Sequence, residues 1–218
     1  MKLYKVIAVL LTYPEQDWLQ SIGELRTTVA AETGRARRAG HRLDGLFTHF
    51  DRGPLIELQE TYVETFDRNP AHSLSIFEHR MGESRERGEA MVRLVEEYRE
   101  FGLEVMSHEL PDFIPVFLEF LSLIPPEEAQ RRLVGIDDVL QILRSRLTGA
   151  GSPYAGVFDA LTALTSDAAL WRTSFSIHKV KRFLRRMPSG IRIEVQGTLA
   201  KESIDRDGHH ESRHESRR

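Results

Sequence analysis

The apolar residues of this chain recur with the period of α-helices along most of its length. From Glu15 to Ala31, large apolar side chains lie three or four residues apart and therefore fall on one stripe of a helix. Pro14 suits the first turn of this helix, and Gly53 and Gly102 suit helix ends. Residues 1–166 show no sustained β-type alternation. The pattern thus predicts an all-α fold, a single helical-bundle domain of about seven to nine helices.

The predicted elements are separated by short polar, proline-containing or glycine-containing segments. They span residues 3–11, 15–31, 43–53, 54–66, 84–101, 110–124, 127–134, 137–147 and 154–164. The segment Thr33–Gly40 (TGRARRAG) has almost no large apolar side chain, so we expect a polar link there. Phe66 and Phe117 fall on the apolar stripes and are expected in the core.

The pattern changes after Ala168, which divides the chain into a helical domain (1–168) and a basic, largely disordered tail (169–218). Phe175–Arg186 (FSIHKVKRFLRR) is basic and weakly amphipathic. Ile191–Val195 alternates like a short strand, but no partner strand is visible in the sequence. The low-complexity segment 208–218 (GHHESRHESRR) is expected to be disordered.

Composition excludes several kinds of site. The 218 residues include no cysteine, which excludes disulfides, thiolate nucleophiles and cysteine-ligated zinc or iron–sulfur centres. No signal peptide and no apolar run long enough to span a membrane is visible, so we expect a cytoplasmic protein without stable membrane insertion.

The net charge of −3 conceals an asymmetry along the chain. From Asp167 onward there are 12 basic and 7 acidic residues, whereas residues 1–166 hold 18 basic and 26 acidic ones. An acidic body disfavours nucleic acid and suits a basic peptide, although solubility alone also explains such a charge.

Known catalytic and cofactor motifs are missing. The sequence contains neither a P-loop nor a dinucleotide-binding glycine motif. Its one Glu-x-x-His pair, Glu211–His214, lies in the predicted tail. Ser84, His79 and Asp112 could form a triad on paper, but no nucleophile elbow surrounds Ser84, which better suits a helix N-cap. We therefore expect no enzyme activity and no bound cofactor.

The segment Ile76–Met91 is dense in charge yet bordered by apolar residues. With catalytic and cofactor sites set aside, we interpret it as a surface for recognition of a partner. Charged residues beside apolar anchors are costly unless they are paired or used, although a solvated face would also explain each of them singly. The candidates for contacts with a partner peptide are Tyr62, Phe77, Glu78, His79, Arg80, Asp112, Phe113 and Glu119.

Four motifs resemble those of nitrate reductase assembly chaperones, the NarJ branch of the TorD/DmsD family. The longest is the segment 76–91 (IFEHRMGESRERGEAM), a loop leading into a helix. The others are YVETFD at 62–67, LPDFIP at 110–115 followed by LEFL at 118–121, and LLTYP at 10–14. The resemblance covers about residues 1–166. Arg80-Met81 and the basic tail depart from the family pattern.

The resemblance implies an all-helical cytoplasmic chaperone for the catalytic α subunit of a respiratory nitrate reductase. Such a chaperone would bind the N-terminal peptide of the apo-subunit until molybdenum cofactor and an iron–sulfur cluster are inserted. We expect a monomer or a weak homodimer that binds no nucleic acid. The peptide groove is expected between 76–88 and 112–120, with Glu78, Asp112 and Glu119 as anionic contacts.

Two other classes remain open from the residues alone. A nucleic-acid-binding or membrane-surface protein would use the basic segment 175–186, and a helical metalloenzyme would use carboxylates and histidines of the bundle.

Overall fold

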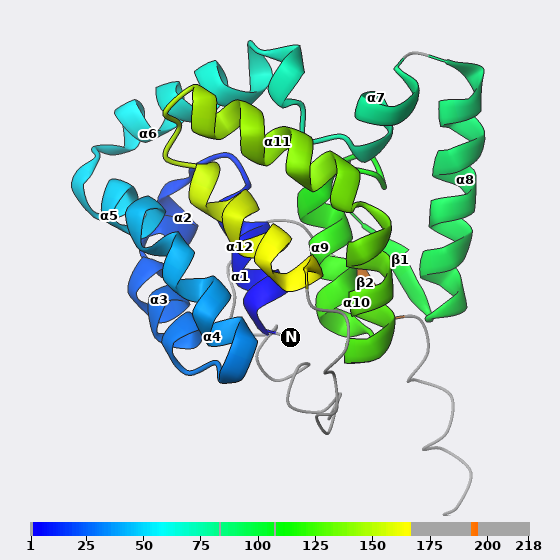
Figure 1. Cartoon of the computed structure of the whole chain (residues 1–218), viewed down its shortest axis with the longest axis horizontal. Coiled ribbons are helices and arrows are strands. Elements are labelled where there is room, and N and C mark those ends of the chain that lie inside the picture. The colour runs from blue at the N-terminus through cyan, green and yellow to red at the C-terminus, as the bar shows by residue number, and fades with distance from the viewer. Residues whose placement is uncertain (1, 83, 107, 167–192, 196–218) are drawn as a thin grey trace, which may run out of the picture.

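The fold was obtained as a computed structural model that describes residues 2–82, 84–106, 108–166 and 193–195 (Figure 1). Helices follow one another along nearly all of this part of the chain, and the predicted all-α class is confirmed. The described α-helices are α1 (Lys2–Leu10), α2 (Gln16–Leu19), α3 (Ile22–Ala30), α4 (Gly34–Gly40), α5 (Asp44–Arg52), α6 (Leu55–Tyr62), α7 (Ile76–Met81), α8 (Arg85–Glu100), α9 (Ile114–Leu123), α10 (Pro126–Gly135), α11 (Asp137–Gly149) and α12 (Ala155–Thr165).

Helices α1 and α9 form the centre of the molecule and pack against each other. All ten residues of α9 are buried, and so are all residues of α1 except Lys2. Helices α1 and α9 carry almost no polar stripe. They are buried because helices that are apolar on all sides pack inside a protein. The exception is Lys5, whose Nζ lies 2.6 Å from Oε1 of Glu119 in a buried ion pair between the two helices.

The N-terminal helices depart from the prediction in two places. The expected helix 15–31 is divided into α2 and α3 at Gln20–Ser21. The expected polar link at Thr33–Gly40 was wrong, because Gly34–Gly40 is helix α4 packed against α3 and α12. Its buried face consists of small residues rather than large apolar ones. A Cβ on Gly40 would clash with Cγ1 of Val29, so a larger residue there would displace the Val29 side chain and loosen the packing of α3 on α4.

A two-stranded antiparallel sheet joins β1 (Leu103–Val105) to β2 (Ile193–Val195). The strand expected within 191–195 therefore has a partner, which lies directly after α8. The rest of the predicted disordered tail, including the basic segment 175–186, lies outside the described residues. Among the residues that the structure describes, none of the helices is a candidate for a membrane span.

Candidate functional site

The charged segment at 76–91 begins with a helix rather than a loop. Its first six residues form α7, and Gly82 ends α7 with φ +57°, a backbone conformation that favours glycine. Ser84 occupies the N-cap position of α8 as predicted, but its side chain makes no capping hydrogen bond.

Asp112, which belongs to the LPDFIP motif, connects this motif to the start of α7. Its side chain is fully buried, and its Oδ2 accepts hydrogen bonds from the Ser75 hydroxyl and from the Phe77 backbone N–H at 3.0 Å. Arg87 of α8 donates to the same Ser75 hydroxyl at 3.1 Å. The backbone of Phe113 pairs with that of Ser75 as an isolated bridge. The two motifs are thus brought together as expected, with Asp112 capping α7 from outside the helix.

The polar residues of α7 bond to neighbouring elements. Glu78 accepts a hydrogen bond from the Ser73 hydroxyl at 2.6 Å, and Nε2 of His79 lies 2.7 Å from the Ser73 carbonyl oxygen. Arg80 donates from Nε to Asp138 at 2.9 Å and from Nη2 to the carbonyl of Gly135. The Arg80 bonds hold α7 against the junction of α10 and α11, whereas the Glu78 and His79 bonds tie α7 to the segment that precedes it.

Two other candidates lie in the interior, apart from α7. Tyr62 is 5% exposed, donates its hydroxyl to the Leu11 carbonyl at 3.1 Å and packs against Tyr154. Burial raises the pKa of its phenol well above the usual range. Glu119 is held in the ion pair with Lys5. Phe66 and Phe117 are buried as predicted.

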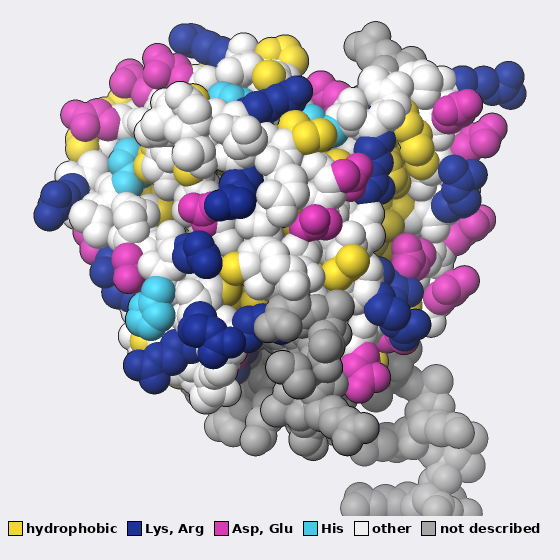
Figure 2. Space-filling model, viewed as in Figure 1, with side chains coloured by type: hydrophobic (Ala, Val, Ile, Leu, Met, Phe, Trp, Pro, Cys, Tyr) yellow, Lys and Arg dark blue, Asp and Glu magenta, His cyan; other side chains and the backbone are white. Residues whose placement is uncertain are grey.

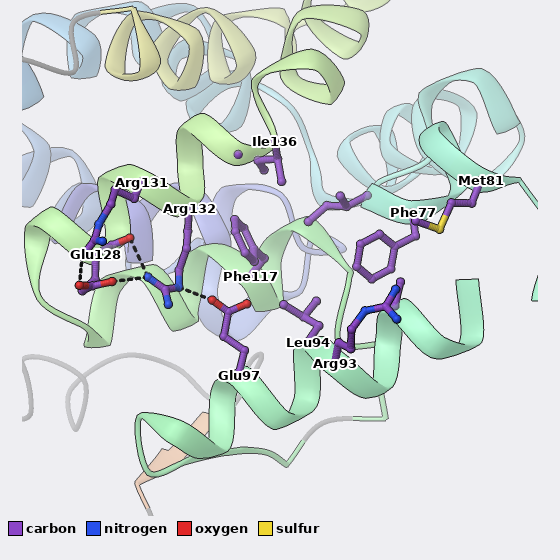
Figure 3. Close-up of a pocket in the computed structure, with 13 residues that line it drawn as sticks. Phe77, Met81, Arg93, Leu94, Glu97, Phe117, Glu128, Arg131, Arg132 and Ile136 are labelled. Atoms are coloured by element: carbon purple, nitrogen blue, oxygen red, sulfur yellow. Dashed lines mark hydrogen bonds and ion pairs between the residues drawn. The ribbon is translucent and has the colours of Figure 1, made fainter. Parts of the chain in front are cut away.

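An open cleft of about 540 Å³ lies between α7, α8, α9 and α10 (Figure 3). Its apolar side chains come from four different elements, with Phe77, Leu94, Phe117 and Ile136 among them, and Met81 stands at one end. Figure 2 shows the apolar band in the hollow between α8 and the rest of the molecule, with charged side chains along both sides.

The charges of the cleft form a network across it. Arg132 of α10 donates to Glu97 of α8 at 2.5 Å and to Glu128 of its own helix at 2.6 Å. Arg131 pairs with Glu128, and Arg93 stands on the α8 side of the cleft (Figure 3). The cleft therefore carries both signs of charge, rather than the acidic character expected for the body as a whole.

Only Phe77 of the eight predicted residues lines this cleft. Phe117, expected in the core, and Leu94 are both buried, yet they also border the cleft, since a helical stripe looks the same in sequence whether it faces another helix or a groove. The pairing of Glu128 with Arg132 four residues later could have been read as a helix-face pair. The hydrogen bond from Arg132 to Glu97 joins residues far apart in the chain, and no sequence pattern indicates it. Within the described residues, no three histidines, aspartates or glutamates gather as a metal site.

Comparison with known proteins places the chain in a family. Residues 31–160 match the family described as nitrate reductase delta subunit. The nitrate reductase molybdenum cofactor assembly chaperone NarJ of Escherichia coli (strain K12) is 37% identical over 163 residues, which cover 75% of this chain and 69% of the relative.

Two further relatives have similar names. The probable assembly chaperone NarW of the same strain is 35% identical, with 77% of this chain and 70% of the relative covered. A probable NarJ of Bacillus subtilis (strain 168) is 28% identical, with 73% and 86% covered. The chain therefore belongs to the nitrate reductase delta subunit family, as a NarJ-type assembly chaperone.

Proposed function

We propose that this chaperone binds the N-terminal segment of the apo α subunit of a respiratory nitrate reductase. Bound in this way, the subunit would stay competent for insertion of molybdenum cofactor and an iron–sulfur cluster and for membrane assembly. The names of the relatives support the assembly role, since each describes a nitrate reductase molybdenum cofactor assembly chaperone. A chaperone of this kind needs a surface for its client rather than a catalytic group.

The proposed peptide site is the cleft between α7, α8, α9 and α10. The observation that carries it is a hollow with an apolar floor, made by the half-buried Phe77 and the buried Leu94 and Phe117, between charged sides. An amphipathic helix can place three or four apolar side chains into such a groove while its polar face stays in water. The cleft is large enough for those side chains, and the peptide backbone would lie along its mouth.

The other predicted residues would act on this site indirectly. Asp112 and Ser75 hold the start of α7, and Arg80 holds its end, so that Phe77 and Met81 are presented to the cleft. Tyr62 and Glu119 would support the fold through their buried contacts. We propose that Glu97 and Glu128 are the carboxylates closest to a bound peptide, in place of Glu78, Asp112 and Glu119.

A matched pair of glutamate substitutions tests the location. Met81→Glu places a charge in the cleft, whereas Val92→Glu places one on α8 at a residue that is 59% exposed and does not line the cleft. We expect Met81→Glu to weaken binding of a synthetic α-subunit N-terminal peptide by about tenfold or more, which corresponds to about 1.4 kcal/mol. Val92→Glu should change the affinity by less than about twofold, since a surface substitution typically changes a free energy by no more than about 0.5 kcal/mol.

The peptide affinity is measured by isothermal titration calorimetry, and circular dichroism checks the fold of each variant. Equal affinities for wild type and folded Met81→Glu would move the peptide site away from this cleft. Absence of any binding to wild-type protein would contradict the proposed function itself.

A further inference from the structure

Helix α8 forms one side of the cleft and is held to the rest of the molecule at few points. Of its sixteen residues, only Ala90, Leu94 and Tyr98 are buried. Tyr98 is the main anchor, because its ring lies 4.4 Å from that of Phe120 on α9 and its hydroxyl donates to the Pro111 carbonyl. Near the start of the helix, Arg87 also donates to the Ser75 hydroxyl at 3.1 Å, so the part of α8 that borders the cleft lies between these two attachments.

Arg132 ties this part of α8 to the opposite side of the cleft. Its Nε donates to Glu97 of α8, while its Nη1 donates to both the side chain and the backbone carbonyl of Glu128 on α10. The guanidinium lies over the Phe101 ring, with its Cζ 4.8 Å from the ring centroid. A planar guanidinium can satisfy two carboxylates and one aromatic face together, which an ammonium group cannot do.

The surroundings of Arg132 distinguish it from the other ion pairs of the cleft. The side chains of Arg132, Glu97 and Glu128 are 20%, 32% and 29% exposed. The Arg131 side chain is 70% exposed, and Arg93 reaches Glu89 of its own helix only at 3.9 Å. Surface pairs of that kind contribute little, whereas a partly shielded fork that is stacked on an aromatic ring holds a defined geometry.

We propose that Arg132 is a positioning residue that clamps α8 to α10 and thereby sets the width of the cleft. The consequence of the clamp for peptide binding rests on the proposed function. A cleft held at a fixed width binds a peptide without the free-energy cost of ordering α8. Breaking the clamp leaves α8 attached through Tyr98 and Arg87 and lets the segment between them move outward. Arg132 then affects peptide affinity without being a direct peptide contact.

Hydrogen–deuterium exchange of the free full-length protein tests the clamp without any ligand. In Arg132→Gln and in Glu97→Gln, the amides of residues 91–100 should exchange about tenfold faster than in wild type, while those of α11 and α12 stay unchanged. The double variant should add little to Arg132→Gln, because both substitutions remove the same contact. Arg132→Lys should recover only part of the protection. The matched control is Arg144→Gln, which breaks an ion pair with Asp159 between α11 and α12 and should leave α8 unchanged.

Titration with the α-subunit N-terminal peptide then tests the consequence. We expect about fivefold weaker binding to Arg132→Gln, with partial recovery in Arg132→Lys. Unchanged exchange in α8, or faster exchange spread equally over α11 and α12, would overturn the clamp. Faster α8 exchange with unchanged peptide affinity would overturn its role in setting the cleft. If wild-type protein binds no peptide, the proposed function fails, but the exchange data still decide whether Arg132 clamps α8.

Discussion

Lys5–Glu119 and Arg132–Glu97 are both ion pairs that join two helices, yet they lie in opposite surroundings. The first is sealed between α1 and α9, with side chains 7% and 5% exposed, whereas the second stands at an open cleft with side chains 20% and 32% exposed. Charges removed from water must keep their partner, but charges at a cleft can exchange partners with water or a ligand. Burial, rather than residue type, thus separates the supporting residues from the candidates for recognition.

The largest effect is expected from breaking the central pair. Glu119→Gln removes the carboxylate charge that faces Lys5 in the buried pair, and we expect the free energy of unfolding to fall by about 3–5 kcal/mol. Urea denaturation followed by circular dichroism measures this loss. The double variant Lys5→Met/Glu119→Leu should recover most of it, because an apolar pair removes both buried charges. A loss below about 1 kcal/mol in Glu119→Gln would show that water reaches this pair.

A smaller effect is expected from Asp112, which is buried but serves the cleft. Asp112→Ala removes the acceptor for the Ser75 hydroxyl and the Phe77 N–H, so we expect a loss of about 1.5–3 kcal/mol in the free energy of unfolding. Because α7 carries Phe77 into the cleft, peptide affinity should fall even where the variant remains folded. Glu119→Gln should leave the peptide affinity of its folded fraction unchanged. Equal peptide affinities for wild type and Asp112→Ala would show that Asp112 does not position α7.

Much of the fold could be predicted because its helices carry strong apolar stripes between clear breaks. The segments predicted at 127–134 and 137–147 correspond to α10 and α11, which only Ile136 separates. Helix α4 was missed because its burial depends on small residues such as Gly40, which a pattern of large side chains does not reveal. The partner of β2 could not be predicted, because strand pairing between distant segments depends on tertiary packing.

The candidate site was only partly predictable for a related reason. The rule that a charge beside apolar anchors must be either paired or used for binding drew attention to Asp112. It cannot decide whether such a charge is paired inside the protein or contacts a partner. The partner that decides it, Ser75, lies 37 positions earlier in the chain. Conversely, Glu97 and Arg132 look like members of solvated helix faces in the sequence. Only the approach of α8 to α10 makes them one contact.

The smallest effect is expected at the exposed pair that holds the end of α7. The hydrogen bonds from Arg80 lower the pKa of the Asp138 carboxyl below its usual value. A lowered pKa in the folded state means that the pair stabilises the protein above the unfolded pKa of about 3.9 and that this stabilisation is lost as the pH falls through the folded value. Because the Asp138 side chain is 56% exposed, we expect Arg80→Gln to cost no more than about 1 kcal/mol at pH 7.

Urea unfolding of wild type and Arg80→Gln at several pH values from 7 to 2.5 measures this difference. It should be constant down to about pH 4 and then shrink towards zero, since protonated Asp138 no longer attracts the guanidinium. Asp138→Asn serves as the control, because it should lack the same pH-dependent contribution while Arg80 remains. A difference that persists undiminished at pH 2.5 would assign the effect of Arg80 to its bond with the Gly135 carbonyl, which does not titrate.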